Sequence, residues 1–582
     1  MGRDTVRIQN IRFARRAFFV YAANGIAAAL GVALATLCDA VVVGNAFGEV
    51  GLAITSVVMP VYILYNFISF ALGIGGGTLV SQAFGREDRK GAQDLFSQCL
   101  ALALLCSVPI ALLGSLFLAP VVSLLGGGSL GEPCLRYVGA VIAGAPVFVA
   151  APVLSLALRA DGDPGRSTAG VILSSCVNLV LDLVFLFGLD TGVEGAAWAM
   201  VIGQGCAVAV YLPHFFQKKY ALRLRLALPT PARAAALLRG GAGTASAYIW
   251  QFCYLSVFNN LVAGVSGAAG LAVLNLVFNL SMLTSAIADG IAQTIPALAG
   301  TYQGEQDHFS LDYTVRLSLK TALIAALALA ALLLCLTRPV IALFGVSDPA
   351  VLSAGVTAAR IYCLAIPFTC VNSTLCACWQ AMGYPRLALA VQLLRGCLLV
   401  LGSGVPLILL LGSGGAAAAL AVGEALALPA ALLLARARKR RAGACSVLLL
   451  PPPASEGAVY EDVLDGQFHR LPEIVQAVED FCEQQDIPPA TAYSIHLTIE
   501  ELGTNIIRYG FQDQKPHYIA FKVARYGEEI CVRIRDDATS YDPFDSQRGD
   551  ELDSLGVELV RRRAKRFLYQ RRLIFNNLLI IL

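Results

Sequence analysis

The sequence predicts an all-α polytopic membrane protein with twelve transmembrane helices in two pseudo-symmetric six-helix lobes, followed by a small soluble α/β domain. Composition is the first reason: 57% of the 582 residues are hydrophobic, only 14% are charged, and the mean hydropathy is +0.68. The second reason is that apolar runs of roughly 20 residues, the length that crosses a bilayer, recur from Phe18 to Leu434 and stop after Ala437. Lipid is therefore the solvent for most of the chain.

The apolar runs divide the chain into spans and domains. The expected spans cover residues 17–43, 51–80, 96–125, 135–158, 168–189 and 193–215, then 243–266, 269–299, 315–344, 351–379, 387–411 and 415–436. The expected domains are a cytoplasmic N-terminus (1–16), a first lobe (17–215), a basic loop (216–242), a second lobe (243–437), a basic and proline-rich linker (438–457) and a soluble domain (458–582).

Basic residues flank alternate spans, and they predict the orientation. Lys and Arg gather at residues 86–90, 159–166, 218–225 and 436–441, whereas the turns at 126–134, 189–194 and 345–350 contain neither. Because basic loops stay on the cytoplasmic side, both termini are expected there, as an even number of spans requires. No cleavable signal peptide is visible, so the first span is expected to remain in the protein. The expected location is the plasma (inner) membrane.

Two motifs recur at a period of about 220 residues, the third reason for the predicted fold. Arg159–Pro164 opens the fifth span and Gln380–Pro385 the eleventh, while Phe84–Asp88 is echoed by Gln303–Asp307. Since each half holds an even number of spans, the two copies share one orientation and are expected to be related by an axis along the membrane normal. This geometry predicts two lobes around a central cavity.

Burying a carboxylate inside an apolar span costs free energy, so such residues are candidates for function. Asp39 lies in the first span, and Asn178 and Asp182 share one helix face in the fifth. Glu424 lies in the twelfth span, and the sequence around it offers no partner. The functional interpretation is a site for H⁺ or Na⁺, and the alternative is that each side chain reaches a membrane interface near a helix end.

The sixteen cysteines predict packing rather than metal binding. Most lie singly in apolar runs, where cysteine behaves as a small hydrophobic residue. The one close pair, Cys376 and Cys378, has no nearby His or carboxylate at the spacing of a zinc site.

Several spaced motifs of the membrane part resemble the multidrug and toxic-compound extrusion (MATE) family. They are Asp39 with Val43–Asn45, Gly73–Gly77 leading to Ser81–Gly85, Arg159–Pro164, and Asn178 to Asp182 followed by Phe187–Gly188. The resemblance covers roughly residues 15–437.

This resemblance implies a two-lobed antiporter that exchanges H⁺ or Na⁺ for organic, often cationic, drugs, with Asp39, Asn178 and Asp182 as the coupling site. Asn259 matches Asp39 in the repeat, so coupling is expected to be asymmetric. Glycines 73 and 75–77 are expected to allow helix bending or close helix contact. Lipid-linked sugar flippases share the architecture, which leaves the substrate open.

The tail after Pro451–Pro453 has the composition of a soluble protein. We expect helices over 471–485 and 489–509, the second with an apolar stripe formed by Ile495, Ile499, Leu502 and Ile506. Further expected elements are strands around 519–523 and 530–534 joined at Gly527, an acidic segment at 536–543, a helix opening at 554–557, and paired strands within 573–582 around Asn576–Asn577.

The order of these elements resembles the GHKL ATPase fold of the anti-sigma-factor serine/threonine kinase type. The resemblance implies Mg-ATP as cofactor, with Glu501 as general base, Asn505 holding Mg²⁺, Asp536 recognising adenine and Gly556 giving the phosphates access to backbone. One position departs from the family, because Ala538 stands where the Asp-x-Gly box has glycine. ATP binding is therefore in question.

The leading hypothesis is a secondary drug antiporter with a cytoplasmic nucleotide-responsive regulatory domain. A membrane receptor with a protein kinase output and a lipid-linked precursor flippase are the alternatives, so enzyme activity stays open. No Walker-type loop is present, which argues against ATP-driven pumping. Expected partners are membrane lipid and a small organic substrate, with a cytoplasmic regulatory protein as a further candidate, but no nucleic acid.

Overall fold

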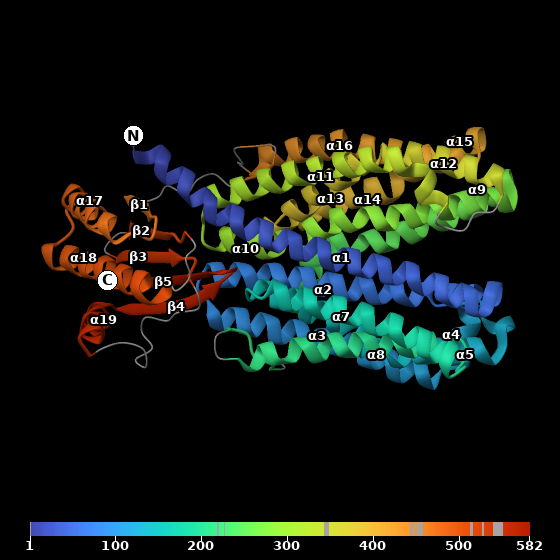
Figure 1. The fold of residues 1–582 in the computed structure, drawn as a ribbon, viewed down its shortest axis with the longest axis horizontal. Helices are drawn as coiled ribbons and strands as arrows, with labels where there is room; N and C mark the ends of the chain where they lie inside the picture. The colour runs from blue at the N-terminus through green and yellow to red at the C-terminus, as the bar shows by residue number, and fades with distance from the viewer. Residues whose placement is uncertain are drawn as a thin grey trace. The chain divides into compact units, whose positions relative to one another are not determined.

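The computed structural model describes residues 2–217, 220–225, 227–342, 348–442, 446, 448–450, 458–511, 516–526, 529–538 and 551–582. The chain divides into two compact units (Figure 1). The membrane unit comprises Phe18–Phe216 and Leu222–Pro452, and the soluble unit comprises Met1–Ala17, Gln217–Ala221 and Pro453–Leu582.

The membrane unit is helical throughout its described residues apart from short connections. Its α-helices are α1 (Gly2–Val57), α2 (Met59–Gly85), α3 (Arg89–Leu116), α4 (Leu118–Leu124), α5 (Gly131–Ala143), α6 (Ala145–Ala160), α7 (Pro164–Leu183), α8 (Glu194–Tyr211), α9 (Pro231–Ala292), α10 (Ile295–Gly304), α11 (His308–Ala342), α12 (Pro349–Cys363), α13 (Ile366–Ala381), α14 (Pro385–Leu393), α15 (Leu399–Leu411) and α16 (Ser413–Ala442). Single turns of other helix types are η1 (Gly128–Leu130), η2 (Val184–Gly188), η3 (Leu212–Phe216) and η4 (Leu394–Leu398).

Among the described residues, nine helical segments are long and apolar enough to cross a membrane, or up to eleven if two bent pairs each count as one span. The longest segment, Pro231–Gly304, has 74 residues and contains a break at Gly267, so it holds more than one bilayer crossing. The chain is an integral membrane protein. The count of twelve spans stays a prediction.

The backbone repeats at the predicted period. Residues with positive φ recur in pairs that are 219 to 221 positions apart: Gly48 and Gly267, Glu87 and Gln306, Gly162 and Gly383, and Gly192 and Gly412. In the first pair the backbone breaks a long helix with nearly the same angles, φ 58° and ψ −142° against φ 60° and ψ −155°. Since L-residues rarely adopt positive φ, this recurrence is a property of the fold and marks two copies of one unit.

The two lobes touch where repeat-related glycines meet. A Cβ on Gly85 would lie 2.7 Å from the Cα of Gly304, so neither position has room for a side chain. Beside them, Gln82 Nε2 donates to the carbonyl of Ala381 at 3.0 Å. The lobes therefore meet at the end of α2 that leads into the basic loop beginning at Arg86.

Of the two roles expected for glycines 73 and 75–77, close helix contact is the one observed. Helix α2 runs unbroken from Met59 to Gly85. A Cβ on Gly75 would lie 2.1 Å from the carbonyl oxygen of Leu237, which places the backbones of α2 and α9 in direct contact.

The soluble unit is a five-stranded antiparallel sheet packed against helices. Its strands are β1 (Val459–Leu464), β2 (Ile519–Tyr526), β3 (Glu529–Asp536), β4 (Arg566–Arg572) and β5 (Phe575–Ile581), in the order β1-β2-β3-β5-β4. The helices are η5 (Phe468–Arg470), α17 (Leu471–Gln484), α18 (Pro489–Asn505), the π-turn η6 (Ile506–Gly510) and α19 (Glu551–Arg563).

The predicted apolar stripe forms the core of this unit. Ile495, Ile499, Leu502 and Ile506 are all buried together with the inward residues of β2 and β3. Burying a side chain of this size contributes about 1.5–3 kcal/mol. The helix face and the strand alternation read from the sequence are thus confirmed.

The last hairpin differs in detail from the prediction. Its turn lies at Leu573–Ile574, and Asn576 and Asn577 stand inside β5 opposite Arg571 and Gln570. Sequence reasoning placed the bend near the two asparagines because they are common turn residues, but Leu573 adopts the positive φ of 55° instead. Strand β1 was not expected, and the predicted joint at Gly527 lies outside the described residues.

Candidate functional site

Two carboxyl groups meet inside the first lobe. Asp39 of α1 and Asp182 near the end of α7 interact directly through their side chains. Asn178 Nδ2 donates to Asp182 Oδ2 at 3.1 Å, and the Asp182 side chain is fully buried. The structure therefore brings together the three residues predicted for the coupling site.

The acid pair Asp39–Asp182 has oxygen atoms that could bind a proton or a cation. One oxygen of each carboxyl, Oδ1, is buried and has no hydrogen-bond partner among the described residues. Two ionised carboxylates in contact repel each other unless a proton or a cation neutralises one of them. Tyr62 and Tyr137 are close enough to Asp39 to interact with its charge, and both are neutral side chains. The arrangement can hold a single H⁺ or Na⁺.

A π-turn follows the acid pair. Helix α7 ends at Leu183 and continues as η2, Val184–Gly188, in which the backbone hydrogen bonds span five residues. Such turns interrupt the regular hydrogen-bond ladder and are frequent at functional sites. The local departure from α-helix thus begins two residues after Asp182.

Glu424 has a partner that the sequence did not reveal, so the expectation that it stands alone is wrong. Arg395, within the π-turn η4, donates from Nη2 to Glu424 Oε1 at 2.6 Å and from Nε at 3.1 Å. Both side chains are about nine-tenths buried. Asn372 Nδ2 adds a hydrogen bond of 2.8 Å to Glu424 Oε2. Glu424 is an ion-paired residue, which weakens its case as a coupling group.

The second lobe contains two further polar groups that sequence reasoning missed. Asp289 of α9 interacts electrostatically with Arg395, and Asn372 Oδ1 is buried without a hydrogen-bond partner among the described residues. Asp289 and Arg395 both lie inside apolar runs, so the search that found Asp39 could have found them. Asn259, the repeat counterpart of Asp39, is exposed.

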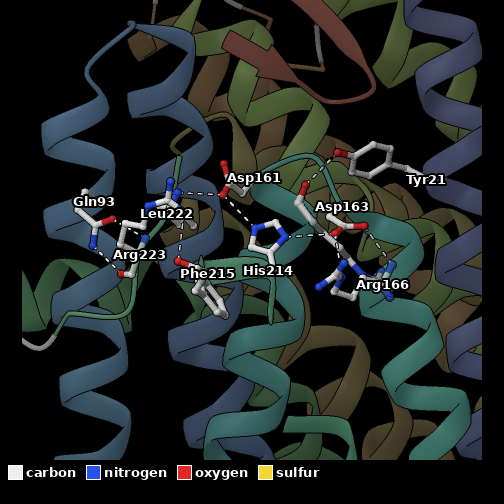
Figure 2. A network of polar contacts seen from close by, with 10 residues as sticks. Tyr21, Gln93, Asp161, Asp163, Arg166, His214, Phe215, Leu222 and Arg223 are labelled. Atoms are coloured by element: carbon white, nitrogen blue, oxygen red, sulfur yellow. Dashed lines mark hydrogen bonds and ion pairs between the residues drawn. The ribbon is translucent and has the colours of Figure 1, made fainter. Parts of the chain in front are cut away.

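The repeated motif Arg159–Pro164 holds a separate polar network (Figure 2). His214 lies between two carboxylates, with Nε2 3.0 Å from Asp161 Oδ2 and Nδ1 3.2 Å from Asp163 Oδ2. Each ring nitrogen of His214 thus lies within hydrogen-bond distance of a carboxylate oxygen. Asp161 also accepts from the backbone N–H of Leu222 at 2.9 Å. The network joins the α6–α7 turn to the end of α8 and to the inter-lobe loop.

In the soluble unit, Asp536 ends β3 as a buried acceptor. Its Oδ1 accepts from Asn576 Nδ2 at 2.8 Å and from the backbone N–H of Ala538 at 3.0 Å. Burial, with a smaller contribution from neighbouring Asp537, raises the pKa of Asp536 to about 7. Both of these hydrogen bonds are accepted by Oδ1, and neither is accepted by Oδ2.

Ala538 is accommodated by a glycine on the facing helix. Its side chain is 2% exposed, and a Cβ built on Gly510 would lie 2.9 Å from the Ala538 Cβ. The extra methyl group therefore packs inside the domain against the space that Gly510 leaves. The effect of Ala538 on ATP binding stays a prediction.

Replacing Gly510 by alanine should destabilise the soluble unit by about 1–3 kcal/mol, because two methyl groups would compete for one space. The change Ala538→Gly in the same chain should restore stability, since it frees that space. Hydrogen exchange of β3 and β5 in the full-length protein measures both effects. Wild-type protection in G510A, or no recovery in the double variant, would contradict the packing.

The other predicted nucleotide residues lie at the helix layer. Asn505 is buried at the end of α18, and a Cβ on Gly556 would lie 2.0 Å from Glu501 Oε2. The Glu501 carboxylate thus lies directly against the backbone of α19 at Gly556. Gly556 lies inside α19, which begins by Glu551, so it is not at the first turn of its helix.

The fold and these sites define a polytopic membrane bundle of the transporter type joined to an ATPase-like domain. The family model MatE matches residues 26–184 and 244–404, more than half of the chain, so the chain belongs to the MATE family. A second model, the histidine kinase-like ATPase domain, matches residues 466–572.

Two curated relatives represent the sequence matches. Multidrug export protein MepA of Staphylococcus saprophyticus is 26% identical over 180 residues, which cover 31% of this chain and 40% of that protein. The FAD transporter of Shewanella oneidensis is 27% identical over 168 residues, or 28% and 37% of the two chains. The matches thus span only about two fifths of these relatives.

Solved MATE structures share the fold of the membrane part. An outward-facing MATE transporter of the MOP superfamily matches with a TM-score of 0.69 at 21% identity, covering 74% of this chain and 96% of that one. A Pyrococcus furiosus MOP transporter, described as having a binding pocket of reverse polarity, matches at 0.66 and 22% identity over 73% and 96%.

Proposed function

We propose that this chain is a secondary active efflux antiporter that exchanges H⁺ or Na⁺ for organic, often cationic, molecules and carries a cytoplasmic nucleotide-binding regulatory domain. The observation that supports exchange most directly is the acid pair Asp39–Asp182, in which one oxygen of each carboxyl is buried and has no partner among the described residues. Membership of a transporter family supports the class.

Exchange needs only that the coupling cation and the substrate favour opposite access states. A cation on the acid pair Asp39–Asp182 neutralises a buried repulsion, so its affinity depends on how well each state shields the pair. Moving a two-state equilibrium from 1:99 to 99:1 takes about 5.5 kcal/mol of differential affinity. Loss of a cation from a buried acid pair can supply energy of this order.

The basic loops support a cytoplasmic location for both termini and for the soluble unit. In the cytoplasm the ATPase-like domain would have access to nucleotide. Relatives named as a multidrug exporter and as a FAD transporter suggest organic substrates of either charge, so the substrate assay must sample both.

The proposal is tested by reconstituting the full chain in liposomes and following efflux of a fluorescent organic cation and of FAD. The pH and Na⁺ gradients are imposed separately, so that the coupling ion is identified by which gradient drives transport. If neither gradient drives transport of any substrate tested, the antiporter proposal is refuted. Gradient-independent movement of a lipid-linked sugar would favour a flippase, and ligand-stimulated phosphorylation without transport would favour a receptor.

The soluble unit fits a Mg-nucleotide. Asp536 offers Oδ2 as an acceptor for the adenine amino group, Asn505 is the proposed Mg²⁺ ligand, and the Ala538 methyl group packs against Gly510. When bound, the nucleotide would supply a phosphate charge for the protein to sense. The role of Glu501 as general base stays a prediction.

Asp536→Asn should give a protein that is more stable near pH 8 but no longer binds ATP. A raised carboxyl pKa means that the stability contribution is full below the unfolded value near 4 and is lost as pH rises through about 7. The variant keeps both hydrogen bonds on Oδ1 and avoids this loss, which amounts to at most about 4 kcal/mol at pH 8.

Adenine recognition requires an acceptor at Oδ2, and the amide of the Asp536→Asn variant would place a donor there. Wild-type ATP affinity should therefore rise from pH 6 to pH 8 as Asp536 ionises, while D536N stays weak throughout. A fluorescent ATP analogue reports affinity in the full-length protein, and hydrogen exchange of β3 at matched pH reports stability. Unchanged affinity in D536N would refute the adenine contact.

A further inference from the structure

The soluble unit holds the first residues of helix α1 against its sheet. The segment Ile11–Ala17 belongs to the same compact unit as Pro453–Leu582. Phe13 is 5% exposed, Ala14 and Ala17 are buried, and the ring of Phe13 meets Phe575 edge to face at 5.0 Å between centroids. An apolar contact of this kind is an interface, since the same side chains on a free helix would face water.

Two arginines flank this apolar contact. Arg12 donates from Nη1 to the Tyr518 hydroxyl at 2.6 Å, and its guanidinium lies 5.0 Å from the centre of the same ring. Arg16 forms an ion pair with Asp537 Oδ2. Tyr518, Asp537 and Phe575 thus form a docking surface for the segment Ile11–Ala17.

The contact with Arg16 offsets part of the free-energy cost of burying the Asp537 carboxylate. Its side chain is 4% exposed, and it also accepts from the backbone N–H of Tyr518 at 2.9 Å and lies 3.1 Å from His517 Nδ1. Burying a carboxylate is costly unless it is paired and hydrogen-bonded. Arg16 supplies a full positive charge beside this buried carboxylate.

Asp537 is the direct neighbour of the proposed adenine acceptor. The charge of Asp537 disfavours a second charge on Asp536, and a cation at Asp537 offsets that repulsion. Adenine binding requires ionised Asp536. A docked Arg16 therefore favours the form of Asp536 that binds nucleotide.

We infer that docking of Ile11–Ala17 on the surface formed by Tyr518, Asp537 and Phe575 and nucleotide binding at Asp536 reinforce each other. The inference rests on the proposed function, in that it takes nucleotide binding as given and names its regulatory connection. Because coupling between two binding events is reciprocal, nucleotide must tighten docking by the same factor by which docking tightens nucleotide.

The docked segment is covalently continuous with the first span. Helix α1 runs from Gly2 to Val57, so the residues after Ala17 lead directly to Asp39 of the acid pair. A nucleotide that tightens docking restrains the cytoplasmic end of this helix. The state of the ATPase-like domain is thereby connected to the helix that carries half of the coupling site, with no phosphoryl transfer required.

The test compares Arg16→Gln with Lys90→Gln in the full-length protein in detergent micelles. Both changes remove one exposed positive charge, but Lys90 lies outside the docked segment, whereas Arg16 forms the ion pair with Asp537. Affinity for a fluorescent ATP analogue should fall about three- to tenfold in R16Q relative to K90Q, the range expected for losing one charge partner near the site. Mg-ATP should also slow hydrogen exchange of residues 11–17 in the wild type and not in R16Q.

Equal affinities in R16Q and K90Q, or exchange of residues 11–17 that Mg-ATP leaves unchanged, would overturn the coupling. A wild type that binds no nucleotide would overturn the nucleotide part of the proposed function and the coupling together. In that case docking is tested separately, by measuring hydrogen exchange of residues 11–17 in Asp537→Asn and in the wild type without nucleotide. Faster exchange of residues 11–17 in D537N upholds the docking surface, and unchanged exchange overturns it as well.

Discussion

Asp39→Asn should abolish ion-gradient-driven efflux while leaving the protein folded. The change removes one of two carboxyls in contact, so a coupling cation no longer relieves a buried repulsion and no longer distinguishes the access states. Gradient-driven transport in liposomes should fall by at least about tenfold, because a cation that binds both access states equally does not shift the equilibrium between them. The melting temperature in detergent should be unchanged or higher, since the substitution removes a repulsion.

Asp190→Asn is the matched control for this experiment. Asp190 is an exposed carboxylate of the same lobe with a positive φ, a conformation that asparagine also tolerates. D190N should transport at the wild-type rate. If D39N retains the wild-type rate and the wild-type ion dependence, the acid pair does not couple transport.

Arg395→Met should cost about 3–5 kcal/mol of stability, because it leaves Glu424 as a buried carboxylate without its charge partner. Asn372 would still donate to Glu424 Oε2 but cannot neutralise it. The loss is measured as a drop in melting temperature of the full chain in detergent. The double variant R395M/E424Q should recover most of that drop, since no buried charge remains.

Arg316→Met provides the comparison for a lost surface ion pair. Arg316 pairs with Asp312 across one helical turn, and its side chain is 65% exposed. Exposed pairs of this kind contribute at most about 1 kcal/mol. If R395M melts at the same temperature as R316M or higher, the Arg395–Glu424 pair does not stabilise the fold. The same conclusion holds if R395M/E424Q melts no higher than R395M.

The membrane fold could be predicted from the sequence because it depends on features of short segments. Each span needs a long apolar run, and the placement of basic residues follows the loops, so residues 17–43 and their equivalents could be located without tertiary information. The acid pair was also accessible, since Asp39 and Asp182 stand out in apolar runs. Their direct contact was not, because it joins helices 143 residues apart in the sequence.

The remaining features depend on tertiary packing. Glu424 seemed unpartnered since Arg395 lies 29 positions away on another helix. The packing of the Ala538 methyl group against Gly510 was not predicted, because no rule of spacing links those two residues. The docking of Ile11–Ala17 on the soluble unit joins the two ends of the chain, which a reading of separate segments cannot relate.

The central claim is that the acid pair Asp39–Asp182 exchanges a cation for substrate. The most direct measurement is cation release on substrate binding, in the detergent-solubilised full chain in weak buffer with a pH dye, repeated with ²²Na⁺ at fixed pH. Substrate should release H⁺ or Na⁺ from the wild type and from D190N, and neither cation from D39N or D182N. Equal release from D39N and the wild type, or substrate binding by the wild type with no release of either cation, would contradict the account.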